Sequence, residues 1–167
     1  MTKPYTIYMG YDPRERLAYD VARHSILSRT NPGEVDIIPL NLENIEVKSV
    51  LTRPIERRGG KLWCPISQAP MATEFAISRF CVPFLKKTGW ALFVDSDIVC
   101  LSDIRELFKL ANPKYAVTCV KHKQESGPAL KMDKQAQTYY ARKNWSSVVL
   151  WNCEHKANQG LTLNDLN

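Results

Sequence analysis

An apolar run that ends in two neighbouring acids is the feature that most constrains this sequence. Residues 90–94, W-A-L-F-V, are continuously apolar, as expected of a strand covered on both faces. Asp95 and Asp97 follow directly, with the small Ser96 between them. Side chains two positions apart in an extended segment point the same way, so both carboxylates face one side, about 7 Å apart. Like charges this close repel unless a cation or a shared proton intervenes.

Strands and helices are predicted in alternation on either side of this run. The predicted strands are rich in β-branched or aromatic residues and cover residues 5–10, 35–40, 115–120 and 148–151. The predicted helices cover residues 12–29, 71–80, a short segment from Asp103, and 134–142. Loops are predicted for residues 41–70 and 122–133. This alternation predicts a single α/β domain over residues 1–167, with a mainly parallel sheet flanked by helices.

Two helices carry specific expectations. Asp12 is predicted to cap the first, with Pro13 at the first helical position and Glu15 completing a capping box. Its apolar face is predicted to consist of Leu17, Ala18, Val21 and Ala22. Pro70 is predicted to open the second helix, whose apolar face is predicted to consist of Ala72, Phe75, Ala76 and Phe80.

Composition narrows the classes of function. The net charge of +6 fits either a solvated surface or an anionic partner, and the basic residues are spread out except at 53–61 and 121–123. No basic stripe is interleaved with aromatic residues, so a nucleic-acid partner is not expected. No apolar run approaches the roughly 18–20 residues of a membrane span, and the N-terminus lacks the apolar region of a signal peptide. A cytoplasmic location without a membrane span is therefore predicted.

The five cysteines lie far apart and form no C-x-x-C pair. Cys81, Cys100 and Cys119 stand in apolar contexts and are predicted to be buried free thiols. Neither a disulfide framework nor a zinc site is expected.

The two acids after the apolar run favour a cation site. Oxygen ligands suit Mg²⁺ or Mn²⁺, ions that also bind substrate phosphates. In open α/β sheets, ligands collect at the carboxyl ends of strands, where Asp95 and Asp97 are expected to lie. A cation held there would bridge the carboxylates to a diphosphate. The alternative is that both aspartates are turn and capping residues.

Four stretches resemble family 8 glycosyltransferases, which have the GT-A fold. F-V-D-S-D-I-V-C-L-S-D-I-R-E-L looks like the family signature Y-L-D-x-D-x-x-x-x-x-D-[IL]-x-E-L. I-Y-M-G-Y-D resembles the first strand of the family, and F-A-I-S-R-F resembles the helix that carries an arginine before the D-x-D strand. W-S-S-V-V-L-W-N resembles the strand F-N-S-G-V-M-L-[WF]-N. The resemblance extends from about residue 5 to residue 153.

The resemblance implies a metal-dependent hexosyltransferase that takes a nucleotide-diphosphate sugar, expected to be a UDP-sugar, and glycosylates a hydroxyl acceptor, expected to be a glycan, with retention. Asp95 and Asp97 would hold Mn²⁺ or Mg²⁺, and Asp95 would lie near the ribose. The remaining residues implied in nucleotide or sugar binding are Gly10, Tyr11, Asp12, Arg79, Ser96, Ser146 and Ser147. The resemblance assigns no residue as nucleophile or base.

The sequence departs from the family in two places. The family's asparagine-serine-glycine reads Ser146-Ser147-Val148, which changes the sugar side. Family members also run about 100 residues further, and that part carries an aspartate-rich segment and a histidine of the metal site. We therefore expect a GT-A domain truncated at its C-terminus. A partner chain or self-association that completes the site is left open.

Two other functions remain open at this stage. A nucleotide-sugar-binding remnant or subunit would keep the fold and the carboxylates but be impaired in catalysis. A phosphatase of the haloacid dehalogenase type also places D-x-D at a strand end, with the first aspartate as nucleophile. That motif usually opens its domain, whereas Asp95 lies past the midpoint of this chain.

Overall fold

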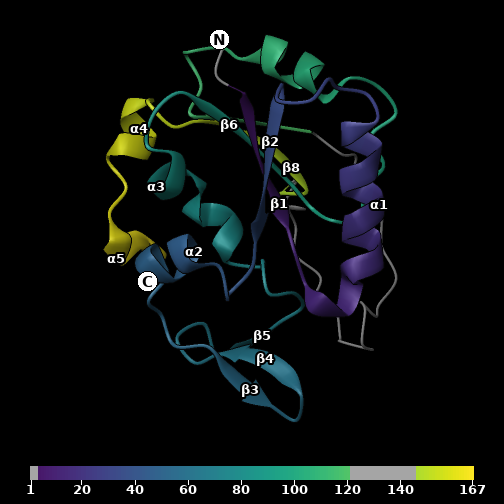
Figure 1. The fold of residues 1–167 in the computed structure, drawn as a ribbon. Helices are drawn as coiled ribbons and strands as arrows, with labels where there is room; N and C mark the ends of the chain where they lie inside the picture. The colour runs from purple at the N-terminus through teal and green to yellow at the C-terminus, as the bar shows by residue number, and fades with distance from the viewer. Residues whose placement is uncertain (1–3, 121–145) are drawn as a thin grey trace.

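The computed structural model describes residues 4–120 and 146–167, which form a layered α/β fold (Figure 1). In this part of the chain the main sheet has five strands in the order β2-β1-β6-β8-β7. These strands are β1 (Tyr5–Gly10), β2 (Val35–Leu40), β6 (Trp90–Val94), β7 (Val117–Cys119) and β8 (Val148–Asn152).

The predicted mainly parallel sheet is confirmed, with one reversed strand. β1 pairs in parallel with both β2 and β6. β8 runs antiparallel to β6 and to β7, so β7 points the same way as β6. The carboxyl ends of β1 and β6 therefore meet at one edge of the sheet, where Met9 pairs with Val94.

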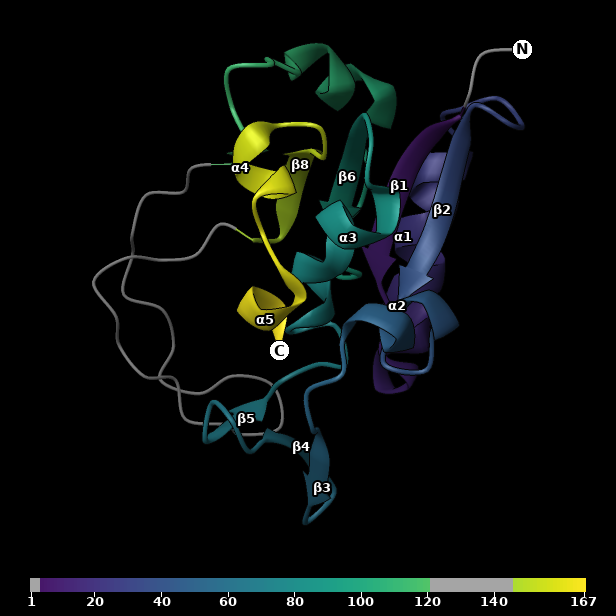
Figure 2. The ribbon, with the colours of Figure 1, turned by 90° about the vertical axis from the view of Figure 1, so that its left-hand side faces the viewer.

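Helices cover both faces of this sheet (Figures 1 and 2). One face is covered by α1 (Arg16–Leu27) and by the 3₁₀ helix η3 (Ile104–Leu110). Two short helices follow β8, namely α4 (Lys156–Gln159) and α5 (Leu163–Leu166). The elements that pack on the other face are α2 (Ile45–Val50), the 3₁₀ helix η2 (Ser78–Cys81), α3 (Val82–Lys86) and α5.

The apolar strand β6 contributes side chains to the cores on both faces of the sheet. Leu92 and Val94 point into the core beneath α1, while Ala91 and Phe93 point into the core beneath α2 and α3, and all four are fully buried. Full burial of a side chain such as Phe93 contributes about 1.5–3 kcal/mol relative to exposure.

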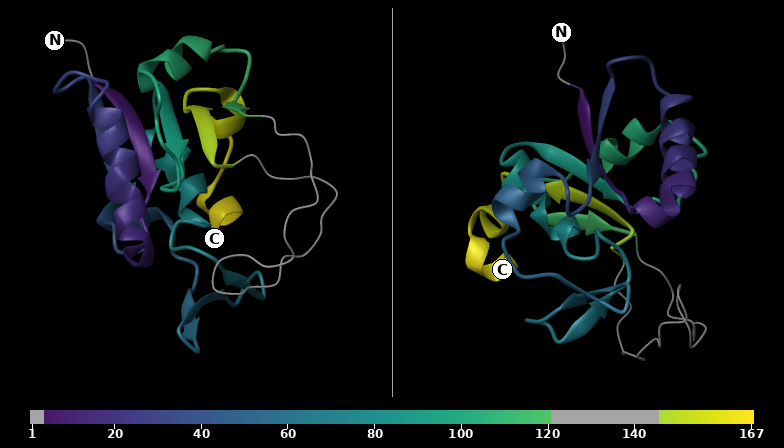
Figure 3. Two further views of the ribbon diagram at one scale, coloured as in Figure 1. Left: turned by 90° about the vertical axis from the view of Figure 1, so that its right-hand side faces the viewer. Right: turned by 60° about the horizontal axis from the view of Figure 1, so that its bottom comes forward.

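Residues 41–70 are more ordered than the predicted loop. Asn44 caps α2, and a separate antiparallel sheet follows (Figure 3). Its strands are β3 (Glu56–Arg58), β4 (Lys61–Cys64) and β5 (Ala69–Met71). These strands are too short for a reliable period in the sequence, and a buried patch of Leu62, Cys64 and Met71 holds the sheet on the body.

The predicted apolar face of the first helix is wrong for Leu17 and Val21 but holds for Ala22. Leu17 and Val21 are 82% and 55% exposed, whereas Tyr19, Ala22 and Ile26 pack on the sheet. Asp12 does act as a cap, but for the 3₁₀ turn η1 (Pro13–Glu15), and α1 begins after it at Arg16.

The helix predicted for residues 71–80 is also wrong. Met71 ends β5, turns follow, and the helical segment begins only at Ser78. Pro83 lies in the first turn of α3. Of the predicted face, Phe75 is buried and Phe80 is 47% exposed. The short helix capped by Asp103 is confirmed as the 3₁₀ helix η3.

The cysteine prediction holds in part. Cys81 is buried, but Cys100 is half-buried and Cys119 is exposed, since Cys119 lies on the edge strand β7. Cys64 and Cys153 are buried instead. The loop predicted for residues 122–133 and the helix predicted for residues 134–142 lie outside the described residues. In the part of the chain that the structure describes, no helix is long and apolar enough to cross a membrane.

Candidate functional site

The site is built at the end of β6. The chain leaves the sheet at Asp95, whose backbone N–H donates to the carbonyl of Ser147 at 2.8 Å, so the segment stays beside the start of β8. Asp95 is half-buried, Ser96 is 1% exposed, and Asp97 is exposed. No hydrogen bond or ion pair joins the Asp97 carboxylate to another of the described residues. The two carboxylates therefore differ, because one is held by the protein and the other faces solvent.

Arg79 holds the inner carboxylate. Its Nη2 lies 3.1 Å from Asp95 Oδ1, and its Nη1 donates to the hydroxyl and the carbonyl of Ser146 at 2.8 and 3.2 Å. The guanidinium also lies over two aromatic rings, 5.4 Å from the Phe75 centroid and 5.1 Å from the Phe93 centroid. Arg79 therefore ties η2 to the ends of two strands.

Burial sets the electrostatics of this pair. The side chains of Arg79 and Asp95 are 13% and 15% exposed. Burial raises the pKa of Asp95, and the Arg79 charge offsets part of that rise. Burial likewise lowers the pKa of Arg79, and the charges of Asp95 and Asp97 oppose that fall. Each charge thus depends on the other, because neither is well solvated.

The loop after β1 forms the second half of the site. Asp12 is 1% exposed. Its Oδ1 accepts from the Arg14 backbone and Nε at 3.0 Å, and its Oδ2 accepts from Arg14 Nη2 at 2.7 Å and from the Glu74 N–H at 3.1 Å. Tyr11 is half-buried, and its ring meets the Tyr19 ring edge-on at 5.0 Å. Both oxygens of Asp12 therefore already accept hydrogen bonds from the protein. The base-binding role that the resemblance implies for Asp12 stays a prediction.

Phe75 joins the two halves. Its carbonyl accepts from Arg79 Nε at 3.3 Å, and its ring closely approaches Gly10 at the end of β1. A Cβ at Gly10 would lie 2.6 Å from the Phe75 ring, so the position has no room for a side chain. Phe75 therefore contacts two of the sequence-predicted residues, Gly10 at the end of β1 and Arg79 on η2.

Unpartnered polar atoms gather around this site. Among the described residues, six buried side-chain oxygen or nitrogen atoms have no hydrogen-bond partner. Four of them belong to Glu74, Ser78, Asp95 and Ser96. For Asp95 the atom is Oδ1, whose contact with Arg79 has the distance of an ion pair but not the geometry of a hydrogen bond. Buried polar groups are normally satisfied, so this concentration indicates a place for ordered water or a ligand.

Sequence reasoning missed two acids of the site. Burial raises the pKa of Glu15, and the negative charges of Asp12 and Asp97 add to the rise. Glu74 is buried and forms an ion pair with Arg57 Nη2 at 3.1 Å. Glu15 was visible only as a capping residue, and Glu74 sat in a stretch predicted to be helical.

No set of three or more His, Cys, Asp or Glu side chains within residues 4–120 and 146–167 is arranged to hold a metal ion. Asp95 and Asp97 supply a pair of carboxylates. This matches the way Mg²⁺ is commonly bound, through one or two carboxylates together with substrate phosphates.

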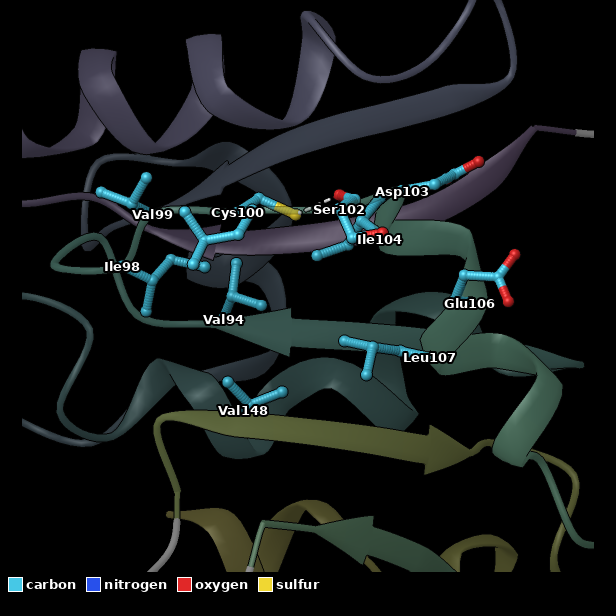
Figure 4. A pocket seen from close by; sticks show the side chains of 11 residues that line it. Val94, Ile98, Val99, Cys100, Ser102, Asp103, Ile104, Glu106, Leu107 and Val148 are labelled. Carbon is cyan, nitrogen blue, oxygen red and sulfur yellow. Dashed lines mark hydrogen bonds between the residues drawn. The ribbon is translucent and has the colours of Figure 1, made fainter.

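A separate hollow of about 470 Å³ lies beside the D-x-D segment (Figure 4). The side chains of Val94, Ile98, Leu107 and Val148 surround its interior. Asp103 is in its wall, but its carboxylate is bound by Arg105 and caps η3. The apolar lining of the hollow offers few groups that could bind a charged diphosphate. The polar site at the ends of β1 and β6 fits a diphosphate better.

The fold is that of part of known glycosyltransferases. The chain is similar to the apo structure of WbbM, a bifunctional glycosyltransferase, with a TM-score of 0.57 and 15% identity, covering 95% of this chain and 33% of that one. It is also similar to the apo form of the glycosyltransferase GlyE of Streptococcus pneumoniae TIGR4, with a TM-score of 0.56 and 14% identity, covering 98% and 37%.

The chain also has a curated relative. It is 44% identical over 161 residues to Protein CDI of Arabidopsis thaliana, covering 96% of this chain and 57% of the relative. The chain therefore spans little more than half the length of that protein. No family model matches the chain.

Proposed function

We propose that this chain forms the nucleotide-sugar-binding part of a metal-dependent glycosyltransferase. The expected substrate is a UDP-sugar, and the expected acceptor is a hydroxyl group on a glycan, with retention of configuration. One observation carries the proposal: an exposed carboxylate, Asp97, stands beside the buried Arg79–Asp95 pair at the carboxyl end of β6, next to the end of β1. The glycosyltransferase-like fold supports it.

The residues fit a hard divalent cation. Asp97 has an exposed carboxylate without a protein partner among the described residues, and Asp95 supplies further oxygen atoms two positions away. Mn²⁺ or Mg²⁺ prefers such ligands and completes its shell with phosphate oxygens. When bound, the cation would stabilise the negative charge of the departing diphosphate.

The remaining residues have binding and positioning roles in this proposal. Arg79 orients Asp95 and anchors the turn at Ser146, so we assign it to positioning rather than to a direct phosphate contact. Ser146 and Ser147 border the sugar. The loop from Gly10 to Asp12 borders the base, and its shape depends on the hydrogen bonds that fix Asp12. Holding the substrate in one orientation supplies part of the rate enhancement.

Turnover of UDP-sugars tests the proposal. UDP release, with the sugar passing to added glycan acceptors or to water, would be measured from UDP-glucose, UDP-galactose and UDP-N-acetylglucosamine, with Mn²⁺ and with chelator. We expect metal-dependent release that falls about 100-fold or more in Asp97→Ala, because loss even of outer-shell partners of a metal costs about 10–100-fold. Asp20→Ala, which removes an exposed carboxylate on α1, serves as the matched control.

Other outcomes would select the alternatives. Metal-dependent UDP binding without release from any UDP-sugar would favour a binding subunit over an enzyme. Release of phosphate from p-nitrophenyl phosphate, abolished by Asp95→Asn, would favour a phosphatase and contradict the proposal.

A further inference from the structure

The small sheet carries an excess of positive charge. We define the basic arm as residues 53–71, which contain β3, β4 and β5 (Figure 3). It has four basic side chains and one acidic one, Glu56. The basic side chains are Arg53, Arg57, Arg58 and Lys61. These residues contribute to the net charge of +6, and they lie outside the proposed nucleotide-sugar site.

The two faces of the basic arm differ. Leu62, Cys64 and Met71 point inward and pack against the body. The opposite face carries Trp63, which pairs across the sheet with Glu56. Because neighbouring positions alternate between faces, Arg58 shares the outer face with Trp63. Its guanidinium lies 4.6 Å from the centre of the Trp63 ring.

The outer face is preorganised for an anion. Arg58 is 55% exposed, its Nε donates to Glu56 at 2.9 Å, and its guanidinium lies over the Trp63 ring, so two contacts hold the side chain on this face. A stacked guanidinium keeps its donors around its edge, where a carboxylate, sulfate or phosphate can accept from two at once. Lys61 pairs directly with Arg58 across the two strands and is exposed, so it adds a second cation beside the first.

The basic arm is fixed relative to the candidate site. Arg57 forms an ion pair with Glu74, whose side chain is 7% exposed. The backbone of Glu74 donates to Asp12 in the loop after β1. At its base, the backbone N–H groups of Thr52 and Arg53 donate to Asn167 Oδ1 at 2.6 and 2.8 Å. The arm therefore stands beside the loop that borders the nucleotide.

We propose that the outer face of the basic arm docks an anionic carbohydrate. Arg58 and Lys61 bind its charged groups, and Trp63 supports Arg58. This inference rests on the proposed function in one respect: the docked carbohydrate is the acceptor, held beside the nucleotide sugar. Arg58, Lys61 and Trp63 all lie on the face opposite the one that packs on the body.

Other anionic partners fit the outer face less well. A membrane-binding tip normally inserts apolar side chains, whereas the tip of the β3–β4 hairpin is Arg58-Gly59-Gly60-Lys61. Single-stranded nucleic acid is held by successive aromatic platforms along a basic groove, and the outer face offers one ring, which Arg58 already covers.

The test uses a fluorescently labelled oligomannuronate and its neutral methyl ester, titrated against the full chain and followed by anisotropy. The test variant is Arg58→Glu with Lys61→Glu. The control is Arg23→Glu with Lys114→Glu, which makes the same change in net charge at exposed positions elsewhere. Circular dichroism melts verify folding, and Arg58→Gln with Lys61→Gln replaces the test variant if charge reversal prevents folding.

We expect the wild type to bind the acidic oligomer about tenfold or more tightly than the ester, and the test variant to lose that preference while the control keeps it. Equal losses in both variants would overturn the proposal, as would equal affinity for the ester. Retained oligomannuronate binding, with selective loss of binding to a single-stranded oligonucleotide or to phosphatidylserine vesicles, would also overturn it.

A UDP titration of the same samples separates the two proposals. UDP binding without oligomannuronate binding by the wild type would overturn the docking surface alone. Oligomannuronate binding at the basic arm without UDP binding would support the docking surface and count against the glycosyltransferase.

Discussion

Arg79 and Asp95 form a largely buried ion pair, with Nη2 lying 3.1 Å from Oδ1. The arginine reaches from η2, while the aspartate ends β6, so the pair connects two elements that meet at the candidate site. Two aromatic rings and the Ser146 hydroxyl surround the guanidinium. Removing either charge would therefore leave the other poorly solvated.

Arg79→Ala is expected to destabilise the protein by about 3 kcal/mol or more, because breaking a buried pair leaves an uncompensated charge. Arg79→Lys keeps the charge but loses the fork that reaches both Asp95 and Ser146, so its loss should be smaller. Urea unfolding measures both. Arg23→Ala, at an exposed position on α1, should change stability by less than about 0.5 kcal/mol. An equally small effect of Arg79→Ala would contradict the structural role.

Acid unfolding should depend on Asp12. Burial acts to raise the pKa of Asp12, but hydrogen bonds from the Arg14 side chain and backbone and from the Glu74 backbone outweigh it, and the pKa is lowered. The unfolded chain has a pKa of about 3.9 at this residue. The ionised carboxylate therefore stabilises the fold above about pH 4, and this stabilisation is lost as the pH falls through the folded pKa.

Asp12→Asn should accordingly reduce stability at pH 7 by about 1–3 kcal/mol, the cost of weakening hydrogen bonds to a buried charged group. The difference from wild type should shrink below about pH 4, as wild-type Asp12 becomes protonated. Thermal melts over a pH series measure this. The contrary result would be a difference that stays constant as the pH falls to about 2.5, which is below the reference carboxyl pKa of about 3.9.

Gly10→Ala should be costly because of Phe75 rather than because of the backbone. The added Cβ would lie 2.6 Å from the ring, and overpacking of this kind costs about 1–3 kcal/mol. In a Phe75→Ala background the same substitution should cost much less. The double-mutant cycle, followed by urea unfolding, should therefore show a coupling energy of about 1 kcal/mol or more, and additive effects would exclude the predicted clash.

The two sides of α1 offer a further test. Leu17→Gln should change stability by less than about 0.5 kcal/mol, since Leu17 is 82% exposed. Ile26→Ala should lower the free energy of unfolding by about 2–5 kcal/mol, because Ile26 is fully buried between α1 and the sheet. Comparable losses for the two variants would mean that α1 packs through the face first expected from its apolar residues.

The elements that the sequence predicted well are those with one dominant signal. The apolar run before Asp95 and the β-branched stretch before Gly10 became central strands, because both of their faces are covered. The position of Asp95 and Asp97 at a carboxyl end followed from the strand assignment. These signals are local, so one sequence was enough to interpret them.

The features that the sequence did not predict depend on contacts between residues far apart in the chain. Leu17 points outward because Tyr19, Ala22 and Ile26 pack on the sheet instead. Asp12, which caps the turn before α1, is itself held by the backbone of Glu74. The small sheet is held in place because Leu62 and Met71 pack against apolar residues outside it, such as Leu42 and Ile77. The engagement of Arg79 with Ser146 joins residues 67 positions apart. No period or cap in the sequence indicates such contacts.

Calorimetric titration with UDP, with and without Mn²⁺, tests the central claim most directly, with wild type compared with Asp97→Ala. The account predicts that Mn²⁺ tightens UDP binding by the wild type and that Asp97→Ala abolishes this gain, while Asp20→Ala retains it. Well-folded wild type that binds no UDP in the presence of Mn²⁺, or Asp97→Ala that keeps the full metal-dependent gain, would contradict it.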